Sequence, residues 1–146
     1  MKILLSLILI SSFLFSYQTS DKLSKETISK LKIEKEKVYF ISFFASWCST
    51  CKHELPLLNE VNKNMDKTKF EFIGIDVDKD ETKGIKFQKE KEVKFRVIND
   101  SKSKIIKSFN PVGIPAIYII KDNKVSNVFI GAVKDIDKKL KEYINE

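Results

Sequence analysis

The stretch Phe43-Phe44-Ala45-Ser46-Trp47-Cys48-Ser49-Thr50-Cys51-Lys52-His53-Glu54-Leu55-Pro56 holds both cysteines of this 146-residue chain, at Cys-x-x-Cys spacing. It lies between the apolar run Val38–Phe44 and a helical pattern of apolar residues. Two thiols placed after a buried strand and at the start of a helix can exchange a disulfide with another protein. The same spacing also occurs in metal sites and in haem attachment, so the flanking residues must separate these interpretations.

Three alternatives fit the flanks poorly. A structural zinc site needs four ligands, and His53 is the single histidine that could join the two cysteines. Haem attachment of the c type needs a histidine directly after the second cysteine, where this chain has Lys52. A permanent stabilising disulfide across so short a loop removes little entropy from the unfolded chain. The pair is therefore interpreted as redox-active, and we expect no metal and no cofactor.

The first residues resemble an export signal. Met1-Lys2 precedes an apolar run, Ile3–Phe15, that only three serines interrupt and that is short for a membrane-spanning helix. Residues 1–20 are predicted to be a signal peptide or, because the cleavage site is poorly defined, an uncleaved N-terminal membrane anchor. Export would place the cysteines in an oxidising compartment such as a bacterial periplasm.

The rest of the chain is predicted to be a polar linker, residues 21–37, and one domain, residues 38–146. The net charge of +7 comes from 27 Lys and Arg against 20 Asp and Glu. The basic residues are mostly lysines interleaved with acidic residues, which is typical of solvated faces. We therefore expect no nucleic-acid partner.

Alternating strand and helix patterns follow the cysteines. Apolar residues predict strands over 38–44, 70–77 and 93–97, and a hairpin from the runs 115–120 and 125–130. Helical patterns begin at Cys51, with Leu57, Leu58, Val61 and Met65 on one stripe, and recur over 80–90, around 105–109 and from Ile136. This order predicts an α/β fold with a mixed central sheet of about five strands flanked by helices.

Disulfide exchange needs a thiolate. A helix N-terminus stabilises negative charge, so Cys48 is the predicted nucleophile, and Cys51, one turn further on, is the predicted resolving thiol. Glu54 shares a helix face with Cys51 and is the candidate proton acceptor; an exposed glutamate that complements the helix dipole fits the spacing equally well. Trp47 is expected to shape a docking surface.

Gly113-Ile114-Pro115 is a second, weaker signal. A proline at the start of an apolar strand is tolerated at a strand end. With a cis peptide bond at Pro115, the backbone of Ile114 would be free to pair with an extended partner peptide. An ordinary turn that begins a strand is the alternative interpretation.

These motifs resemble the thioredoxin-like superfamily, within it the TlpA/ResA branch of exported thiol-disulfide oxidoreductases that includes the CcmG/DsbE proteins. The resemblance covers about Val38 to Glu146 and implies a thioredoxin fold with one extra βα element between the Cys-x-x-Cys helix and the cis-proline strand. It implies that Cys48 attacks, that Cys51 resolves, that Glu54 tunes their acidity, and that Ile114 and Pro115 hold the partner. Ser42 stands where thioredoxin itself has a buried aspartate.

The expected function is reduction of disulfides in envelope proteins by an exported monomer. Cytochrome c maturation, with apocytochrome c as a partner, follows from family analogy, and a membrane thiol reductant is the expected electron donor. A general envelope disulfide oxidoreductase without a haem role is one alternative. A copper or haem chaperone that uses the two cysteines as soft ligands is another, of a different class.

Overall fold

The computed structural model describes residues 16–146. Residues 1–15, which carry most of the predicted signal peptide or anchor, lie outside the described residues. Within residues 16–146, no helix combines the length and the apolar character needed to cross a membrane.

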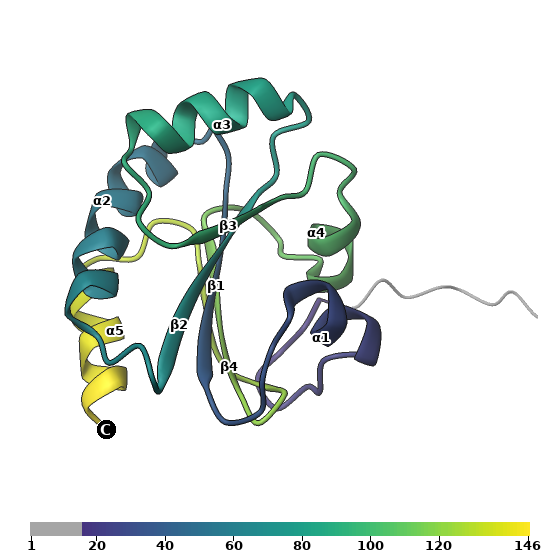
Figure 1. Ribbon diagram of the computed structural model, residues 1–146, viewed down its shortest axis with the longest axis vertical. Helices are drawn as coiled ribbons and strands as arrows, with labels where there is room; N and C mark the ends of the chain where they lie inside the picture. Colours follow the sequence, from purple (N-terminus) through teal and green to yellow (C-terminus); the bar gives the residue numbers. More distant parts are fainter. Residues whose placement is uncertain (1–15) are drawn as a thin grey trace, which may run out of the picture.

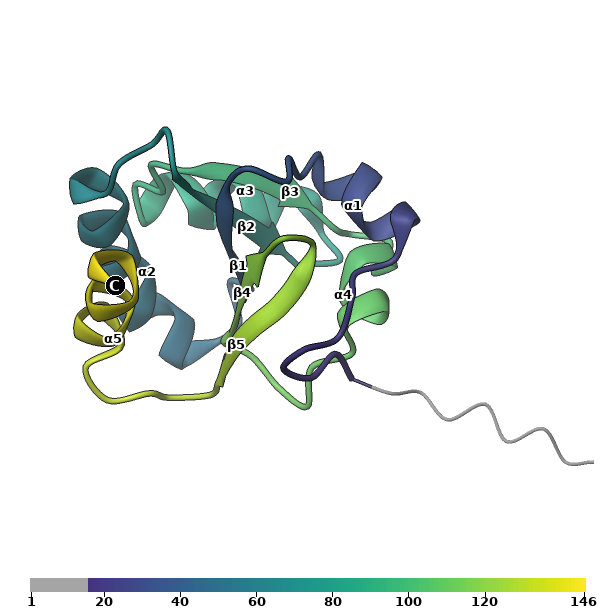
Figure 2. The same ribbon diagram turned by 90° about the horizontal axis from the view of Figure 1, so that it is seen from below.

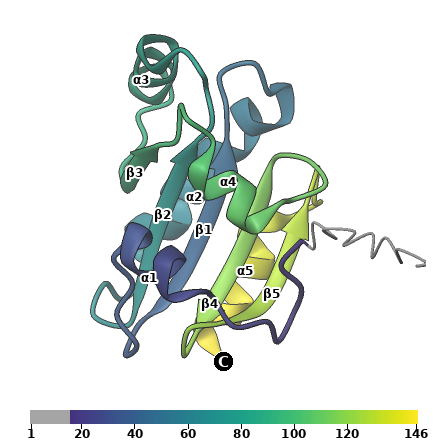
Figure 3. The same ribbon diagram turned by 90° about the vertical axis from the view of Figure 1, so that its right-hand side faces the viewer.

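A mixed sheet forms the centre of the molecule (Figure 1). Its five strands lie in the order β3-β2-β1-β4-β5 (Figure 3). β1 pairs in parallel with β2 and antiparallel with β4, and this confirms the predicted mixed sheet. Six of the seven β1 residues are buried, because helices cover the sheet on both faces. The strands are β1 Val38–Phe44, β2 Phe70–Asp76, β3 Arg96–Asn99, β4 Ala116–Lys121 and β5 Lys124–Ile130.

Helices α2 and α5 cover one face of the sheet, and α1 and α4 cover the other (Figures 2 and 3). Side chains of β1 alternate between these layers: Phe40 contacts Tyr143 of α5, whereas Phe43 contacts Phe109 of α4. The interval between α2 and β4 contains β2, α3, β3 and α4, as the extra βα element requires. The helices are α1 Lys25–Leu31, α2 Ser49–Asn64, α3 Glu81–Glu90, α4 Lys104–Phe109 and α5 Ile136–Asn145.

The segment predicted to be a linker, residues 21–37, instead packs as part of the domain. It contains α1, which begins where the Ser24 side chain accepts a hydrogen bond from the Thr27 backbone N–H. Leu23, Thr27 and Leu31 are buried. Thr27 and Leu31, four residues apart, lie on one face of α1, and Leu23 is buried just before the helix begins. This packing stabilises a helix that the lysine-rich composition did not predict.

The third strand is displaced from its predicted position. The alternating residues 93–97 suggested a strand, but β3 begins at Arg96. The Lys94 backbone N–H donates to the side chain of Asn59, and its carbonyl accepts from the side chain of Asn62. Both groups come from α2, so the backbone of Lys94 is not free to join the sheet.

Candidate active site

One edge of the sheet brings together three segments that are distant in sequence. β1 and β2 are parallel, with Phe44 opposite Asp76, so both strands end at this edge. β4 is antiparallel to β1, with Ala116 opposite Phe43, so β4 begins there. The residues after Phe44, after Asp76 and before Ala116 therefore lie together, at the strand ends where open α/β sheets bind ligands.

Cys48 and Cys51 form a disulfide at this edge, with a sulfur–sulfur distance of 2.14 Å. Cys48 is the N-cap residue of α2, and its Sγ accepts a hydrogen bond from the Cys51 backbone N–H at 3.2 Å. The Cys48 sulfur therefore lies where unpaired backbone N–H groups and the positive end of the helix dipole stabilise a thiolate. The structure thus places the cysteines at the helix N-terminus, as the sequence predicted.

Glu54 is buried on α2 and is not the exposed surface residue of the alternative interpretation. Burial raises the pKa of its carboxyl to about 7. A group with this pKa exchanges its proton readily near neutral pH. Glu54 follows Cys51 by three positions, so both side chains project from the same face of α2.

Two large apolar side chains are exposed at this edge. Trp47, directly before Cys48, is 67% exposed, and Val112, in the loop before β4, is 89% exposed. Ile114 is half-buried, and its peptide bond to Pro115 is cis, as the resemblance implied. Sequence reasoning missed Val112, because a lone valine in a loop carries no signal until its exposure is known.

A cleft of about 320 Å³ opens beside Glu54, between α2 and the start of α5. Leu57 lines it, half-exposed, rather than joining the buried stripe that the helical pattern predicted. Leu55 is buried instead, because α2 turns this face toward the sheet. His53 also lines the cleft and is exposed. A larger cleft, of about 640 Å³, lies between α2 and residues 90–94, and neither cysteine lines it.

Two further polar groups near the site have different environments. Ser42 is buried in β1, and within residues 16–146 its hydroxyl has no hydrogen-bond partner. Asp78, just beyond β2, accepts two hydrogen bonds from Ser46 in the turn before Cys48. The sequence pattern predicted a strand over 70–77 and indicated no role for Asp78. The position of Asp78 directly after that strand, at the edge where such sheets bind ligands, was the signal that could have indicated it. Among the described residues, no group of three or more His, Cys, Asp or Glu side chains is arranged to hold a metal ion.

Comparisons with known proteins agree with this geometry. Residues 14–128 match the model of the AhpC/TSA family. The thiol-disulfide oxidoreductase ResA of Bacillus thuringiensis subsp. konkukian is 30% identical over 118 residues, which are 80% of this chain and 67% of that protein. A ResA of Bacillus cereus is 34% identical over 103 residues, 70% of this chain and 60% of its own length.

Solved structures show the same fold. A putative thiol:disulfide interchange protein DsbE from Chlorobium tepidum superposes with a TM-score of 0.76 at 22% identity, covering 89% of this chain and 97% of the other. A putative protein disulfide isomerase from Bacteroides thetaiotaomicron gives a TM-score of 0.72 at 22% identity, covering 89% and 92%. The mixed sheet and its helices are therefore a thioredoxin-like fold.

Proposed function

Because this chain belongs to the AhpC/TSA family and is a thioredoxin-like thiol-disulfide oxidoreductase, we propose that it is exported and reduces disulfides in envelope proteins. The observation that carries the proposal is the Cys48–Cys51 disulfide at the N-terminus of α2. A disulfide placed there alternates between an oxidised form and a dithiol whose first sulfur is a stabilised thiolate.

The reduced protein acts in two exchanges. The Cys48 thiolate attacks one sulfur of the substrate disulfide, which breaks that bond, forms a mixed disulfide and releases a substrate thiolate that takes up a proton. The Cys51 thiolate then attacks Cys48 Sγ, forms the internal disulfide and releases the second substrate thiolate. Two electrons have passed to the substrate, and a membrane thiol reductant restores the Cys48–Cys51 dithiol.

Glu54 accepts the proton of the Cys51 thiol in the second exchange. Its pKa of about 7 supports this role, because a base is most effective when its pKa is close to the working pH. Glu54→Gln, which keeps the shape of the side chain but cannot accept the proton, is expected to slow exchange near neutral pH and to leave the fold intact. An unchanged rate and an unchanged cysteine titration in this variant would remove Glu54 from the mechanism.

Trp47, Ile114 and Pro115 contact the substrate. The exposed indole of Trp47 supports this assignment, since so large an apolar surface beside the nucleophile suits the partner side of a complex. Ile114 precedes β4 at the same edge, where its backbone can pair with an extended segment of the substrate. The protein acts as a monomer.

The proposed substrates include apocytochrome c, by analogy with the resemblance of the active-site motifs to proteins of cytochrome c maturation. Export is supported by the apolar run Ile3–Phe15 after Lys2. The oxidising compartment beyond the inner membrane is the place where substrate disulfides form and need a reductase.

The experiment is a trap. Cys51→Ser is expressed in the native host, and proteins that stay disulfide-linked to Cys48 are identified, since loss of the resolving thiol leaves the mixed disulfide stranded. The Cys48→Ser/Cys51→Ser double variant is the matched control. Capture of apocytochromes supports the proposal. A broad set of unrelated envelope proteins would contradict the haem role, and capture of nothing above the control would overturn the proposal.

A further inference from the structure

The nucleophile is carried by a short turn. Residues 45–48 connect β1 to α2, and the Cys48 backbone N–H donates to the Ala45 carbonyl at 3.1 Å. Ala45 and Cys48, at the two ends of this turn, are buried, whereas Ser46 is half-buried and Trp47 is exposed between them. Apolar packing therefore does little to fix the middle of the turn that leads to Cys48.

Asp78 supplies a fixed point for this turn from 32 residues away in the sequence. Its Oδ2 accepts from the Ser46 backbone N–H and its Oδ1 from the Ser46 hydroxyl, both at 2.7 Å. Each carboxylate oxygen of Asp78 thus accepts a hydrogen bond from Ser46. Hydrogen bonds to a charged acceptor are shorter and about twice as strong as neutral ones.

Asp78 is itself held in place from two sides. It is only 5% exposed, and the backbone N–H of Val77, its neighbour, donates to the Phe44 carbonyl at 2.9 Å. The Asp78 backbone N–H donates to Asp76 Oδ1 at 2.9 Å, and Asp76 Oδ2 accepts from the Gln88 amide of α3 at 2.7 Å. Asp78, just beyond β2, is therefore tied to the end of β1 through Val77 and to α3 through Asp76.

We propose that Asp78 is a positioning residue for thiol-disulfide exchange. Its carboxylate accepts two hydrogen bonds from Ser46 and so fixes the turn that contains Trp47 and Cys48. This inference deepens the proposed function and rests on it for the reacting sulfurs, but not for the identity of the substrate. Cys48 Sγ must stay over the N-terminus of α2 to remain a thiolate, and the Ser46 anchor lies two residues before it.

Loss of the Asp78 carboxylate has different expected effects if Asp78 positions the turn, if it acts through its charge, or if it only stabilises the fold. If Asp78 acted through its negative charge, its loss would favour the Cys48 thiolate and speed its reactions. If Asp78 only stabilised the fold, its loss would weaken the protein against urea and leave the folded active site unchanged. If Asp78 positions the turn, its loss allows Cys48 to move away from the N-terminus of α2, and the Cys48 thiol reacts more slowly.

The test uses the reduced protein and three variants. Asp78→Ala removes both bonds to Ser46. Asp78→Asn removes the charge but keeps the shape, since its amide oxygen can accept from the Ser46 N–H and its NH₂ can donate to the Ser46 hydroxyl. Ser46→Ala removes only the hydroxyl bond and leaves Asp78 in place. The readouts are the rate of Cys48 alkylation by iodoacetamide at pH 6 and the rate of insulin disulfide reduction.

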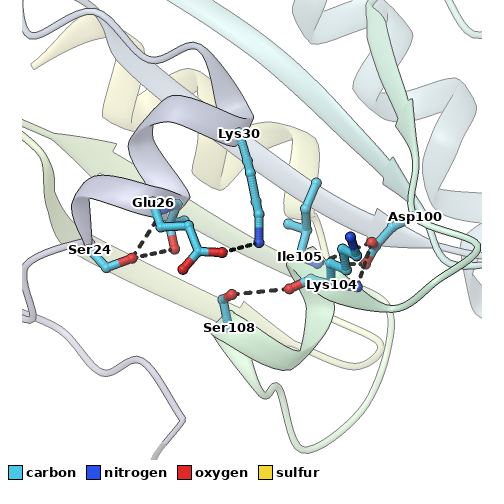
Figure 4. Close-up of polar contacts among 8 residues, drawn as sticks. Ser24, Glu26, Lys30, Asp100, Lys104, Ile105 and Ser108 are labelled. Atoms are coloured by element: carbon cyan, nitrogen blue, oxygen red, sulfur yellow. Dashed lines mark hydrogen bonds and ion pairs between the residues drawn. The ribbon is translucent and has the colours of Figure 1, made fainter.

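Asp100 provides a matched control. It is also 5% exposed, and its carboxylate likewise accepts hydrogen bonds from backbone N–H groups at the start of α4, those of Lys104 and Ile105 (Figure 4) and that of Ile106. None of its hydrogen bonds within residues 16–146 reaches the turn before Cys48. Asp100→Ala is expected to lower stability against urea and to leave the alkylation rate unchanged.

A misplacement of about 1 Å can cost about 100-fold in rate, so we expect Asp78→Ala to lose about tenfold or more in insulin reduction and to slow alkylation. Asp78→Asn should recover most of both rates. The rates of Ser46→Ala should lie between those of the unaltered protein and those of Asp78→Ala. In the Ser46→Ala background, Asp78→Ala should cost less, because one of the two bonds is already absent. Faster alkylation in both Asp78 variants, unchanged alkylation in folded Asp78→Ala, or an equal change in Asp100→Ala would each overturn the proposal. None of these outcomes depends on which envelope protein the trap captures.

Discussion

Replacing Glu54 by Gln is expected to make the oxidised protein about 3 kcal/mol more stable at pH 8, and to leave its stability nearly unchanged at pH 4. The pKa of the buried Glu54 carboxyl rises from 4.5 to about 7. Each pKa unit corresponds to about 1.4 kcal/mol, so the ionised carboxylate makes the folded state about 3 kcal/mol less stable than a neutral group of the same shape would.

The sign follows from proton binding. Between pH 4.5 and pH 7 the folded state holds a proton on Glu54 that the unfolded state has already lost. Stability therefore falls as the pH rises through this window, and it is constant with respect to Glu54 above it. The glutamine side chain of the variant neither binds nor loses a proton, so the variant lacks this contribution at every pH.

The assay is urea unfolding of both oxidised proteins from pH 4 to pH 8, with the difference between them plotted against pH. Other titrating groups cancel in that difference, because they are common to both proteins. Glu60→Gln is the matched control, since Glu60 is exposed on the same helix. A difference that stays flat across the range, or that matches the Glu60→Gln curve, would refute the argument that burial raises the pKa of Glu54.

Three further substitutions test the packing and the surface of the site. Ser42→Ala is expected to raise the free energy of unfolding by about 1 kcal/mol, because it removes a buried hydroxyl that lacks a partner among the described residues; a loss of stability in urea would show that the hydroxyl is satisfied. Gly84→Ala should lower it by about 1 to 3 kcal/mol, since the new Cβ would lie 2.6 Å from Asp76 Oδ2, and unchanged urea unfolding would contradict that contact. Trp47→Ala should change the free energy of unfolding by less than about 0.5 kcal/mol, because the side chain is exposed. It should raise KM for insulin and leave the rate with glutathione disulfide unchanged. Equal effects on both substrates would argue against a role of Trp47 in docking the protein substrate.

The redox chemistry was predictable because it depends on residues that are close in sequence. Cys48 and Cys51 are three residues apart, and a helix that begins between them brings their sulfurs together whatever the rest of the fold does. The order of strands and helices was also predictable, since apolar periodicity is a local property. The turn of the hairpin is also a local feature. Asp122 and Asn123 both have positive φ, a conformation that short polar residues adopt readily in such turns.

Contacts with groups distant in sequence decided the start of β3 and the presence of α1, which the sequence pattern did not predict. Residues 93–97 alternate like a strand, yet Asn59 and Asn62 of α2 take the backbone bonds of Lys94. The lysine-rich segment before β1 looked like a linker, yet it contains a helix because its few apolar residues find a partner surface on the domain. In both cases the outcome depends on what lies opposite in space.

By itself, the sequence determined that this protein carries a dithiol at a helix N-terminus in an α/β fold, because spacing and periodicity act within a few residues. Only the tertiary structure decided that Glu54 is buried, and hence that its pKa lies near 7, because burial depends on which elements cover it. Only the tertiary structure joined Asp78 to Ser46, through parallel strands that end at one edge of the sheet. The identity of the reacting atoms is thus local, whereas their acidity and position are properties of the whole fold.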